Sequence, residues 1–147
     1  MSLRYTADVA IVGAGIAGIV TAIELLDQGK SVILLDRDKR EQLGGLAPTA
    51  FGGMALIGTP QQQKMGIADN PALAYQDWCS FADFSEQDYW PKRWAHCYVN
   101  RSVSDIYDWL VARGVRFFPA VNWVERGLYT PGNSLPRYHI LWGTAQH

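Results

Sequence analysis

The sequence predicts an α/β fold that opens with a strand, a helix and a second strand. Residues 9–12 form an apolar run whose β-branched members are typical of a buried strand. A glycine-rich turn follows directly, and apolar residues at helical spacing continue from Ile16 to Leu26. A second apolar run over 31–35 ends in the acid Asp36. Strand, glycine turn, helix, strand and acid in this order are typical of a βαβ unit that binds a dinucleotide.

The three glycines of the turn have different roles in such a unit. Gly13 permits the tight turn out of the strand, and Gly15 lets the backbone approach phosphate oxygens without a Cβ in the way. Gly18 lets the helix lie close to the strand. The helix N-terminus offers unpaired N–H groups to an anion, so we expect a pyrophosphate to bind here. The alternative is a structural βαβ unit with incidental glycines, and the agreement of all five elements argues against it.

An acidic and a basic side chain, Asp36 and Arg37, follow the second strand. Asp36 lies 18 residues after Gly18, where a carboxylate accepts hydrogen bonds from a ribose hydroxyl. Arg37 begins a charged cluster over 37–41, which is either a solvated loop or, through Arg37, a contact to the adenosine half of the ligand. Because Asp36 would repel a 2′-phosphate, the sequence argues against NADP.

A segment without charge carries two glycine pairs. No charged residue occurs from Gln42 to Gln63, and the pairs are Gly44–Gly45 and Gly52–Gly53. Such a segment cannot form a stable helix, and its lack of charge argues against a plain surface linker. We expect backbone that lines a long cofactor; a tightly packed loop is the alternative.

The rest of the chain predicts helices followed by short strands. Asp69 or Asn70 can cap a helix that starts at Pro71 and runs through Trp78. A longer helix is expected over 92–113, and strands over 115–118, 121–124 and 137–142. A turn is expected over 130–134. The side chains expected in the core from the long helix are Trp94, Tyr98, Trp109 and Leu110.

Composition excludes several classes of function. The chain has 147 residues, a formal net charge of −1 and 48% hydrophobic residues, which suits one globular core and gives no electrostatic reason for binding nucleic acid or an anionic membrane. The uncharged run over 9–23 is too short to span a membrane. Cys79 and Cys97 have no metal or redox spacing, so we expect reduced thiols and a cytoplasmic protein.

No residue is identified as catalytic. The chain has no serine–histidine–acid order, zinc spacing or phosphate-binding lysine loop. His96 is interpreted as a packed or surface histidine within a helix. His139, close to Arg137 and Tyr138, is the better candidate for touching a cofactor or substrate, although nothing in the spacing requires it.

These motifs together resemble a known family. The glycine motif 13–18, Asp36 and Gly44–Gly45 resemble FAD-dependent oxidoreductases of the fumarate reductase and 3-ketosteroid dehydrogenase type. The stretches 76–78, 90–95, 109–115 and 132–137 look like those of a group of FAD-binding dehydrogenases in that superfamily. The resemblance covers essentially the whole chain and implies a Rossmann-like FAD/NAD(P)-binding domain that is incomplete, with a βαβ start, a helical segment and short strands.

The resemblance assigns the cofactor-binding positions by motif. It implies FAD as cofactor, with the pyrophosphate at the glycine motif, the ribose at Asp36 beside Arg37, and the flavin half along the uncharged segment. The matching positions are Gly13, Ala14, Gly15, Ile16, Ala17, Gly18, Asp36, Arg37, Gly44, Gly45, Leu46, Gly52 and Gly53. Leu46 and Ala47 stand where such families often carry a polar residue, which puts one side-chain contact to the cofactor in doubt.

Length is the larger departure from the family. Its members are several times longer, so residues 1–147 are expected to form the N-terminal portion of the FAD-binding domain, without the substrate-capping domain. The complete enzyme would pass hydride between a small-molecule substrate and the flavin, and this chain alone is expected to be inactive. The alternatives are a non-catalytic nucleotide-binding fragment, an oligomerising fragment and an NAD-binding dehydrogenase. The incomplete sheet leads us to expect self-association.

Overall fold

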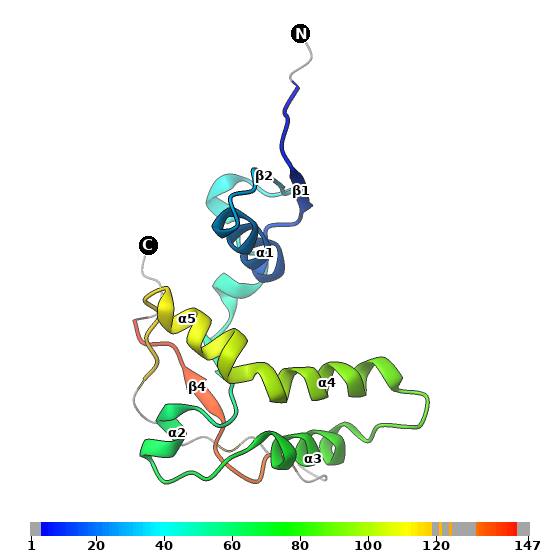
Figure 1. Ribbon diagram of the computed structural model, residues 1–147, viewed down its shortest axis with the longest axis vertical. Helices are drawn as coiled ribbons and strands as arrows, with labels where there is room; N and C mark the ends of the chain where they lie inside the picture. Colours follow the sequence, from blue (N-terminus) through cyan, green and yellow to red (C-terminus); the bar gives the residue numbers. More distant parts are fainter. Residues whose placement is uncertain (1–3, 119–120, 122–123, 125–131, 144–147) are drawn as a thin grey trace. The chain divides into compact units, whose positions relative to one another are not determined.

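The computed structural model describes residues 4–118, 121, 124 and 132–143, and divides the chain into two compact units. The first unit is Met1–Phe51 and the second is Gly52–His147. Figure 1 shows their elements in chain order. Along the described residues, no helix has the length and apolar character needed to cross a membrane.

The first unit contains the predicted βαβ arrangement. Strands β1 (Val9–Val12) and β2 (Val32–Leu35) pair in parallel, and helix α1 (Ile16–Asp27) connects them. Val9 lies opposite Val32, so the two strands end together beside the glycine turn. Helix α1 stops at Gly29, whose φ of 74° is a left-handed conformation that glycine adopts without strain.

Few side chains of the first unit are buried. Among residues 4–51, Ala14 and Ala22 are the buried ones. Val12 is 85% exposed and Leu35 is 50% exposed, although both end sheet strands. The charged cluster over 37–41 is exposed and includes a 3-10 turn at Arg40–Gln42, in agreement with a solvated loop. A second 3-10 turn, Ala47–Thr49, follows.

The second unit has a short antiparallel sheet. Strand β3 (Gly53–Ala55) pairs with β4 (Tyr138–Ile140). The sequence did not predict β3, and β4 lies within the strand expected over 137–142. The strand expected over 115–118 is reduced to a single bridge from Phe117 to Leu141. The strand expected over 121–124 and the turn expected over 130–134 lie partly outside the described residues.

Helices occupy most of the second unit. They are α2 (Pro60–Lys64), α3 (Pro71–Ala82), α4 (Tyr89–Arg101) and α5 (Asp108–Ala112), with a π-helical stretch, Ser102–Tyr107, between the last two. Helices α3 and α4 run side by side, with the loop between them at one end (Figure 1). The continuous run over 89–112 confirms the long predicted helix, whereas α2 was not predicted.

Side chains from several elements form the core of the second unit. Ile57, Ala74 and Val99 are buried together, and Tyr75 and Tyr98 pack against them. The expectation that Trp94 lies in the core is wrong, because this side chain is 71% exposed. The buried face of the helical run carries Ala95, Val99 and Ser102 at spacings of four and three, and Trp94 precedes that stripe by one position. Of the other expected members, Tyr98, Trp109 and Leu110 are half-buried.

Ser102 fixes the start of the π-helical stretch. Its buried hydroxyl donates to the carbonyl of Ile57 at 3.2 Å and accepts from the N–H of Ile57 at 3.1 Å. A single side chain therefore satisfies both backbone groups of a residue outside the helix. Irregular turns of this kind are common where a helix adapts to a local contact.

Candidate functional site

The glycine turn of the first unit is held tightly between the strand ends and α1. Gly13 has a φ of 100°, and its N–H donates to the carbonyl of Leu35 at 2.7 Å. A Cβ on Gly18 would lie 1.9 Å from the carbonyl oxygen of Gly13. No side chain fits into that space, so α1 approaches the turn as the sequence predicted.

The N-terminus of α1 is open toward an anion. Its N-cap is Gly15, which has no side chain to accept hydrogen bonds from the first turn. The first intrahelical acceptor in use is the carbonyl of Gly15, bonded to the N–H of Ile19 at 3.0 Å. The N–H groups of Ile16, Ala17 and Gly18 therefore have no acceptor within the helix, which suits a pyrophosphate.

Asp36 reaches back to the glycine turn. Its Oδ2 accepts from the N–H of Ala14 at 2.5 Å, and its Oδ1 accepts from the N–H of Asp38 at 2.8 Å. The hydrogen bond from Ala14, followed by that from Asp38, holds the pKa of the Asp36 carboxyl below its ordinary value. The group is therefore ionised at neutral pH.

The first glycine pair packs on the same turn. The N–H of Gly44 donates to the carbonyl of Ala14 at 2.9 Å, and Gly44 forms a parallel bridge with Gly15. A Cβ on Gly45 would lie 3.3 Å from the Cα of Gly15. Both glycines have positive φ, 118° and 62°. These contacts support the alternative of a tightly packed loop at Gly44–Gly45, and the backbone of this pair lies beside the glycine turn.

A pocket of about 350 Å³ adjoins the turn. Residues of the predicted set that line it are Gly13, Asp36, Arg37 and Gly45, joined by Val12 and Leu35. Leu46 is not among the lining residues and is largely exposed. The structure thus brings the glycine turn, the acid and the first glycine pair together within one unit.

The second glycine pair belongs to the second unit and has a packing explanation. The carbonyl of Gly52 accepts from the N–H of Leu141 at 2.8 Å. A Cβ on Gly53 would lie 2.2 Å from the ring of Tyr138 on β4. A larger residue at position 53 would therefore have to displace the Tyr138 ring, whether or not a ligand is present.

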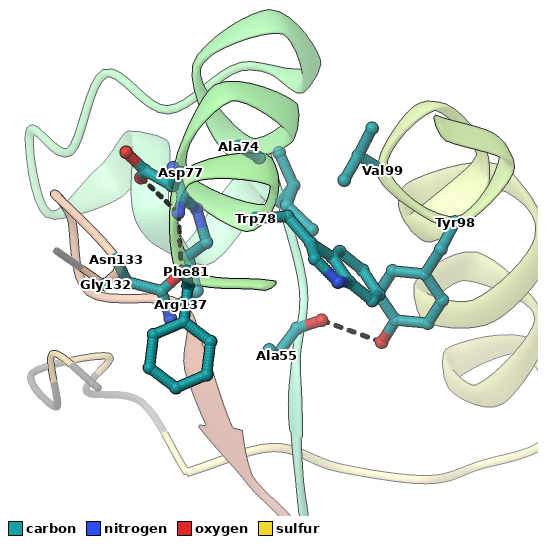
Figure 2. Close-up of a pocket in the computed structure, with 11 residues that line it drawn as sticks. Ala55, Ala74, Asp77, Trp78, Phe81, Tyr98, Val99, Gly132, Asn133 and Arg137 are labelled. Atoms are coloured by element: carbon teal, nitrogen blue, oxygen red, sulfur yellow. Dashed lines mark hydrogen bonds and ion pairs between the residues drawn. The ribbon is translucent and has the colours of Figure 1, made fainter. Parts of the chain in front are cut away.

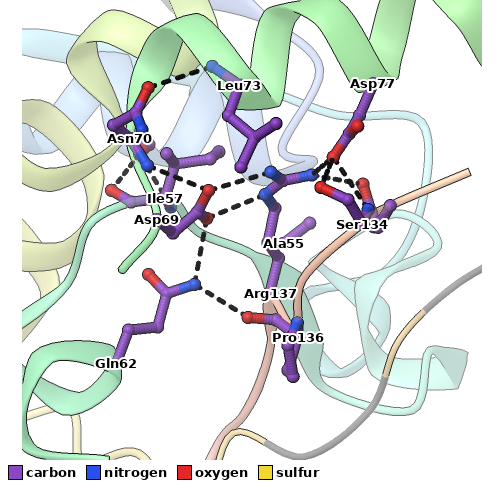
Figure 3. Close-up of polar contacts among 12 residues, drawn as sticks. Ala55, Ile57, Gln62, Asp69, Asn70, Leu73, Asp77, Ser134, Pro136 and Arg137 are labelled. Atoms are coloured by element: carbon purple, nitrogen blue, oxygen red, sulfur yellow. Dashed lines mark hydrogen bonds and ion pairs between the residues drawn. The ribbon is translucent and has the colours of Figure 1, made fainter. Parts of the chain in front are cut away.

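A buried arginine organises the polar interior of the second unit (Figure 3). Arg137 is 2% exposed, and its Nε and Nη2 donate to Asp69 Oδ2 and Oδ1, each at 2.8 Å. Its Nη1 donates to Asp77 Oδ2 at 2.6 Å and to Asn133 Oδ1 at 2.8 Å. The first contact is a bidentate pair, and together the two aspartates compensate the buried charge.

Neighbouring groups complete this cluster. Gln62 donates from Nε2 to Asp69 Oδ2 at 3.0 Å and to the carbonyl of Pro136 at 2.8 Å. Asp77 Oδ2 also accepts from the N–H and the hydroxyl of Ser134, each at 2.8 Å. Burial acts to raise the pKa of Asp77, but the hydrogen bonds from Ser134 and Arg137 hold that pKa below its ordinary value. The sequence analysis missed this cluster; the signal was an arginine inside an expected strand.

His139 is part of the same interior and has no free nitrogen. Its Nδ1 lies 2.7 Å from the carbonyl of Arg137, and its Nε2 lies 2.7 Å from the Thr59 hydroxyl. A carbonyl can only accept, so Nδ1 carries the proton and Nε2 accepts from Thr59. Burial lowers the pKa of His139. Both ring nitrogens are thus bonded within the unit, so the structure does not support a ligand contact at His139, the better of the two histidine candidates in the sequence. His96, by contrast, is exposed and packs edge-on against Tyr75.

The second unit also has a pocket of about 380 Å³ between α3, α4 and the sheet (Figure 2). One face of α3 supplies Ala74, Asp77, Trp78 and Phe81, at helical spacing. The Tyr98 hydroxyl donates to the carbonyl of Ala55 at 2.8 Å, which fixes the α4 wall. The side chains that line this pocket are mostly aromatic and aliphatic. Arg137 also lines the pocket, but its guanidinium is paired with Asp69 and Asp77. Nowhere in the described residues do three or more metal-binding side chains gather.

Comparison with known protein families assigns the chain to one of them. The FAD binding domain family matches residues 8–147, and the chain belongs to that family. FAD is accordingly its cofactor, as the sequence predicted. The open N-terminus of α1 fits the pyrophosphate of FAD, and the close approach of Gly18 to the Gly13 carbonyl keeps that helix end at the turn.

The most similar relatives include steroid dehydrogenases. A KsdD-like steroid dehydrogenase of Mycobacterium tuberculosis is 49% identical over 143 residues, 95% of this chain and 25% of the relative. One from Mycolicibacterium smegmatis is 47% identical over 142 residues, 94% of this chain and 26% of the relative. The chain thus spans about a quarter of the length of these relatives.

Solved structures of the same type share the fold. The 3-ketosteroid-Δ4-(5α)-dehydrogenase of Rhodococcus jostii matches with a TM-score of 0.76 and 28% identity, over 99% of this chain and 33% of that chain. A flavocytochrome c3 fumarate reductase matches with a TM-score of 0.72 and 22% identity, over 95% of this chain and 22% of that chain. The chain is therefore an FAD-binding portion of the kind found in FAD-dependent oxidoreductases.

Proposed function

We propose that the first unit binds the ADP half of FAD. The pyrophosphate would lie on the N–H groups at the start of α1, and the adenosine ribose would lie against Asp36, with Arg37 beside it. The observation that carries this proposal is the open helix end at Gly15 together with a carboxylate at the same turn. The parallel βαβ arrangement supports a Rossmann-like domain of which residues 1–147 are the N-terminal portion.

The flavin half of FAD would lie along the uncharged segment that carries the two glycine pairs. Gly44 and Gly45 lie beside the phosphate-binding turn, which supports a contact of their backbone to the middle of the cofactor. For Leu46, Gly52 and Gly53 the proposal has only the motif in its favour. Their contacts are tested by substituting each residue and titrating FAD.

We infer that the complete protein is an FAD-dependent dehydrogenase that acts on a steroid ketone. Bound flavin supplies hydride transfer, and the protein supplies orientation and proton movement. The relatives aligned along almost the whole chain are named steroid dehydrogenases, whereas a fumarate reductase of Shewanella frigidimarina aligns over 72 residues, 49% of the chain. This difference favours a steroid over a dicarboxylate. The part of the protein that would contact this substrate, including the capping domain, lies outside the 147 residues.

The cofactor experiment comes first. The purified 147-residue chain is mixed with FAD, washed, and its absorption spectrum is compared with that of free FAD. Retained flavin with shifted bands supports the proposal, and NAD serves as the competing ligand. Absence of retained flavin from both this chain and the full-length protein would refute it. Full-length protein is then assayed with 4-androstene-3,17-dione and with fumarate, using a dye electron acceptor or donor.

Two smaller proposals concern association and location. Exposed Val12, Leu35 and Leu46 support self-association of the chain in isolation, and light scattering tests it. A cytoplasmic location fits two cysteines that are not joined to each other, Cys79 and Cys97. A fusion to a fluorescent protein in a bacterial host tests that location.

A further inference from the structure

We propose that Asp36 is a positioning residue for the glycine turn, in addition to its contact with ribose. This inference rests on the proposed FAD site but concerns the protein before FAD arrives. A carboxylate that only awaited a ribose would point into the pocket with both oxygens free. Here both oxygens are already bonded to backbone N–H groups.

Ala14 is the residue through which Asp36 acts. Ala14 is fully buried, and each of its two backbone groups has one partner. Its N–H donates to Asp36 Oδ2, and its carbonyl accepts from the N–H of Gly44. Asp36 therefore fixes the peptide unit before Ala14, and Gly44 fixes the peptide unit after it.

This arrangement decides where the phosphate-binding groups point. Ala14 lies between Gly13, whose φ is 100°, and Gly15, the N-cap of α1. Glycines have wide conformational freedom, so the turn would sample many states without an external restraint. Fixing Ala14 restricts the turn to the state in which the N–H groups of α1 face the pyrophosphate. Preorganisation of this kind increases affinity because less freedom is lost on binding.

The second carboxylate oxygen of Asp36 restrains the loop that follows β2. Asp36 Oδ1 accepts from the N–H of Asp38, which shapes the turn that carries Arg37. One ionised side chain thus holds the backbone on both sides of the proposed ribose site. An asparagine at position 36 could accept from Ala14 through its single oxygen but could not also accept from Asp38 through its NH₂ group. The two substitutions Asp36→Asn and Asp36→Ala should therefore differ.

The test compares two ligands on four proteins. FAD and an FAD whose adenosine ribose lacks both hydroxyls, called the deoxy ligand, are titrated into wild type, Asp36→Asn, Asp36→Ala and the charge control Glu41→Gln. Glu41 is exposed and lies five residues further along. If Asp36 acts on the turn, Asp36→Ala weakens binding of the deoxy ligand by roughly ten- to a hundredfold, the range that corresponds to losing the charged hydrogen bond to Ala14. Asp36→Asn should fall between Asp36→Ala and wild type, and Glu41→Gln should resemble wild type. Unchanged affinity of Asp36→Ala for the deoxy ligand would overturn the proposal.

A measurement without ligand separates this inference from the proposed function. Amide hydrogen exchange of the free chain should accelerate at Ala14, Asp38 and Gly44 in Asp36→Ala, with β1, β2 and the second unit as internal references. Unchanged exchange at Ala14 and Gly44, or equal acceleration throughout the first unit, would overturn the positioning role. If wild type retains no FAD, the proposed function fails, while exchange still decides whether Asp36 holds the turn.

Discussion

The two units of the chain differ in the side chains that they bury. In the first unit, two alanines are buried while Val12 and Leu35 at the strand ends remain exposed. The second unit has an apolar core as well, but it also buries the side chains of Arg137 and Asp69, which form a salt bridge. The first unit is therefore shaped by backbone hydrogen bonds and glycines, and the second by side chains that meet across the fold. A Cβ added to a glycine should therefore disturb the first unit most, and loss of a buried charge should destabilise the second unit most.

The largest effect is expected when the buried arginine is removed. Arg137→Met leaves Asp69 and Asp77 buried without a cation, which should lower the free energy of unfolding of the second unit by about 3–5 kcal/mol. Urea unfolding measures the loss, and hydrogen exchange assigns it to a unit.

A surface ion pair provides the matched control for this change. Arg101 pairs with Asp105 on an exposed stretch, so Arg101→Met should cost less than about 1 kcal/mol. Equal losses for the two substitutions would show that burial of Arg137 has no special weight.

In the first unit, a single added methyl group should weaken FAD binding strongly. Gly18→Ala places a Cβ against the carbonyl of Gly13, so we expect about a 100-fold loss of FAD affinity, or roughly 2.7 kcal/mol. Isothermal titration of FAD measures it. Gly15→Ala is the informative partner, because its Cβ would have no atom within 4 Å. It should leave the free chain's unfolding unchanged and weaken FAD only through contact with the ligand. A Gly18→Ala protein that binds FAD normally would contradict the structure.

Substitution of Gly53 distinguishes a glycine needed for packing against Tyr138 from one needed for contact with the cofactor. Gly53→Ala should destabilise the second unit by about 1–3 kcal/mol, because the new Cβ meets the Tyr138 ring. Thermal unfolding of the free chain measures the loss. In a Tyr138→Ser background, Gly53→Ala should cost much less, as a double-mutant cycle would show. A Gly53→Ala protein of normal stability with weakened FAD binding would instead assign Gly53 to the cofactor.

The smallest effect is expected from acid. His139 is buried and neutral, and its pKa lies below the ordinary value of 6.5. The unfolded chain therefore binds a proton that the folded chain does not, so stability should fall as the pH drops below about 6.5. His139→Asn should lose this dependence, whereas the exposed His96→Gln should keep it. Urea midpoints at several pH values provide the measurement. A further loss is expected below the ordinary pKa of 3.8 as Asp77 is protonated.

Local sequence signals predicted the first unit well. The apolar runs, the glycine spacing and Asp36 lie within 36 residues, and each has a local physical meaning. The sequence also favoured ligand-lining backbone at Gly44–Gly45, where the structure has backbone packed on the glycine turn. A glycine pair signals close approach, but it does not say whether a ligand or another backbone approaches.

The second unit was predicted less completely. Strand β3 begins at Gly53, and glycine in a strand argues against the assignment. Helix α2 was missed although Thr59 and Gln62 form a capping box around Pro60, which a sequence can show. The cluster around Arg137 was out of reach, because its partners Asp69 and Asp77 are 68 and 60 residues away. Charge pairs at that separation leave no periodic signal.

The pairing of β3 with β4 has a consequence for synthesis of the chain. Ala55 and Tyr138 are partners although 83 residues separate them. At about 5–20 residues per second, a ribosome needs roughly 4–17 s to make the intervening segment. During that interval β3 has no partner strand, and Asp69 and Asp77 have no guanidinium to pair with. The glycine turn, whose parts lie within the first 45 residues, can form while the rest of the protein is still being translated.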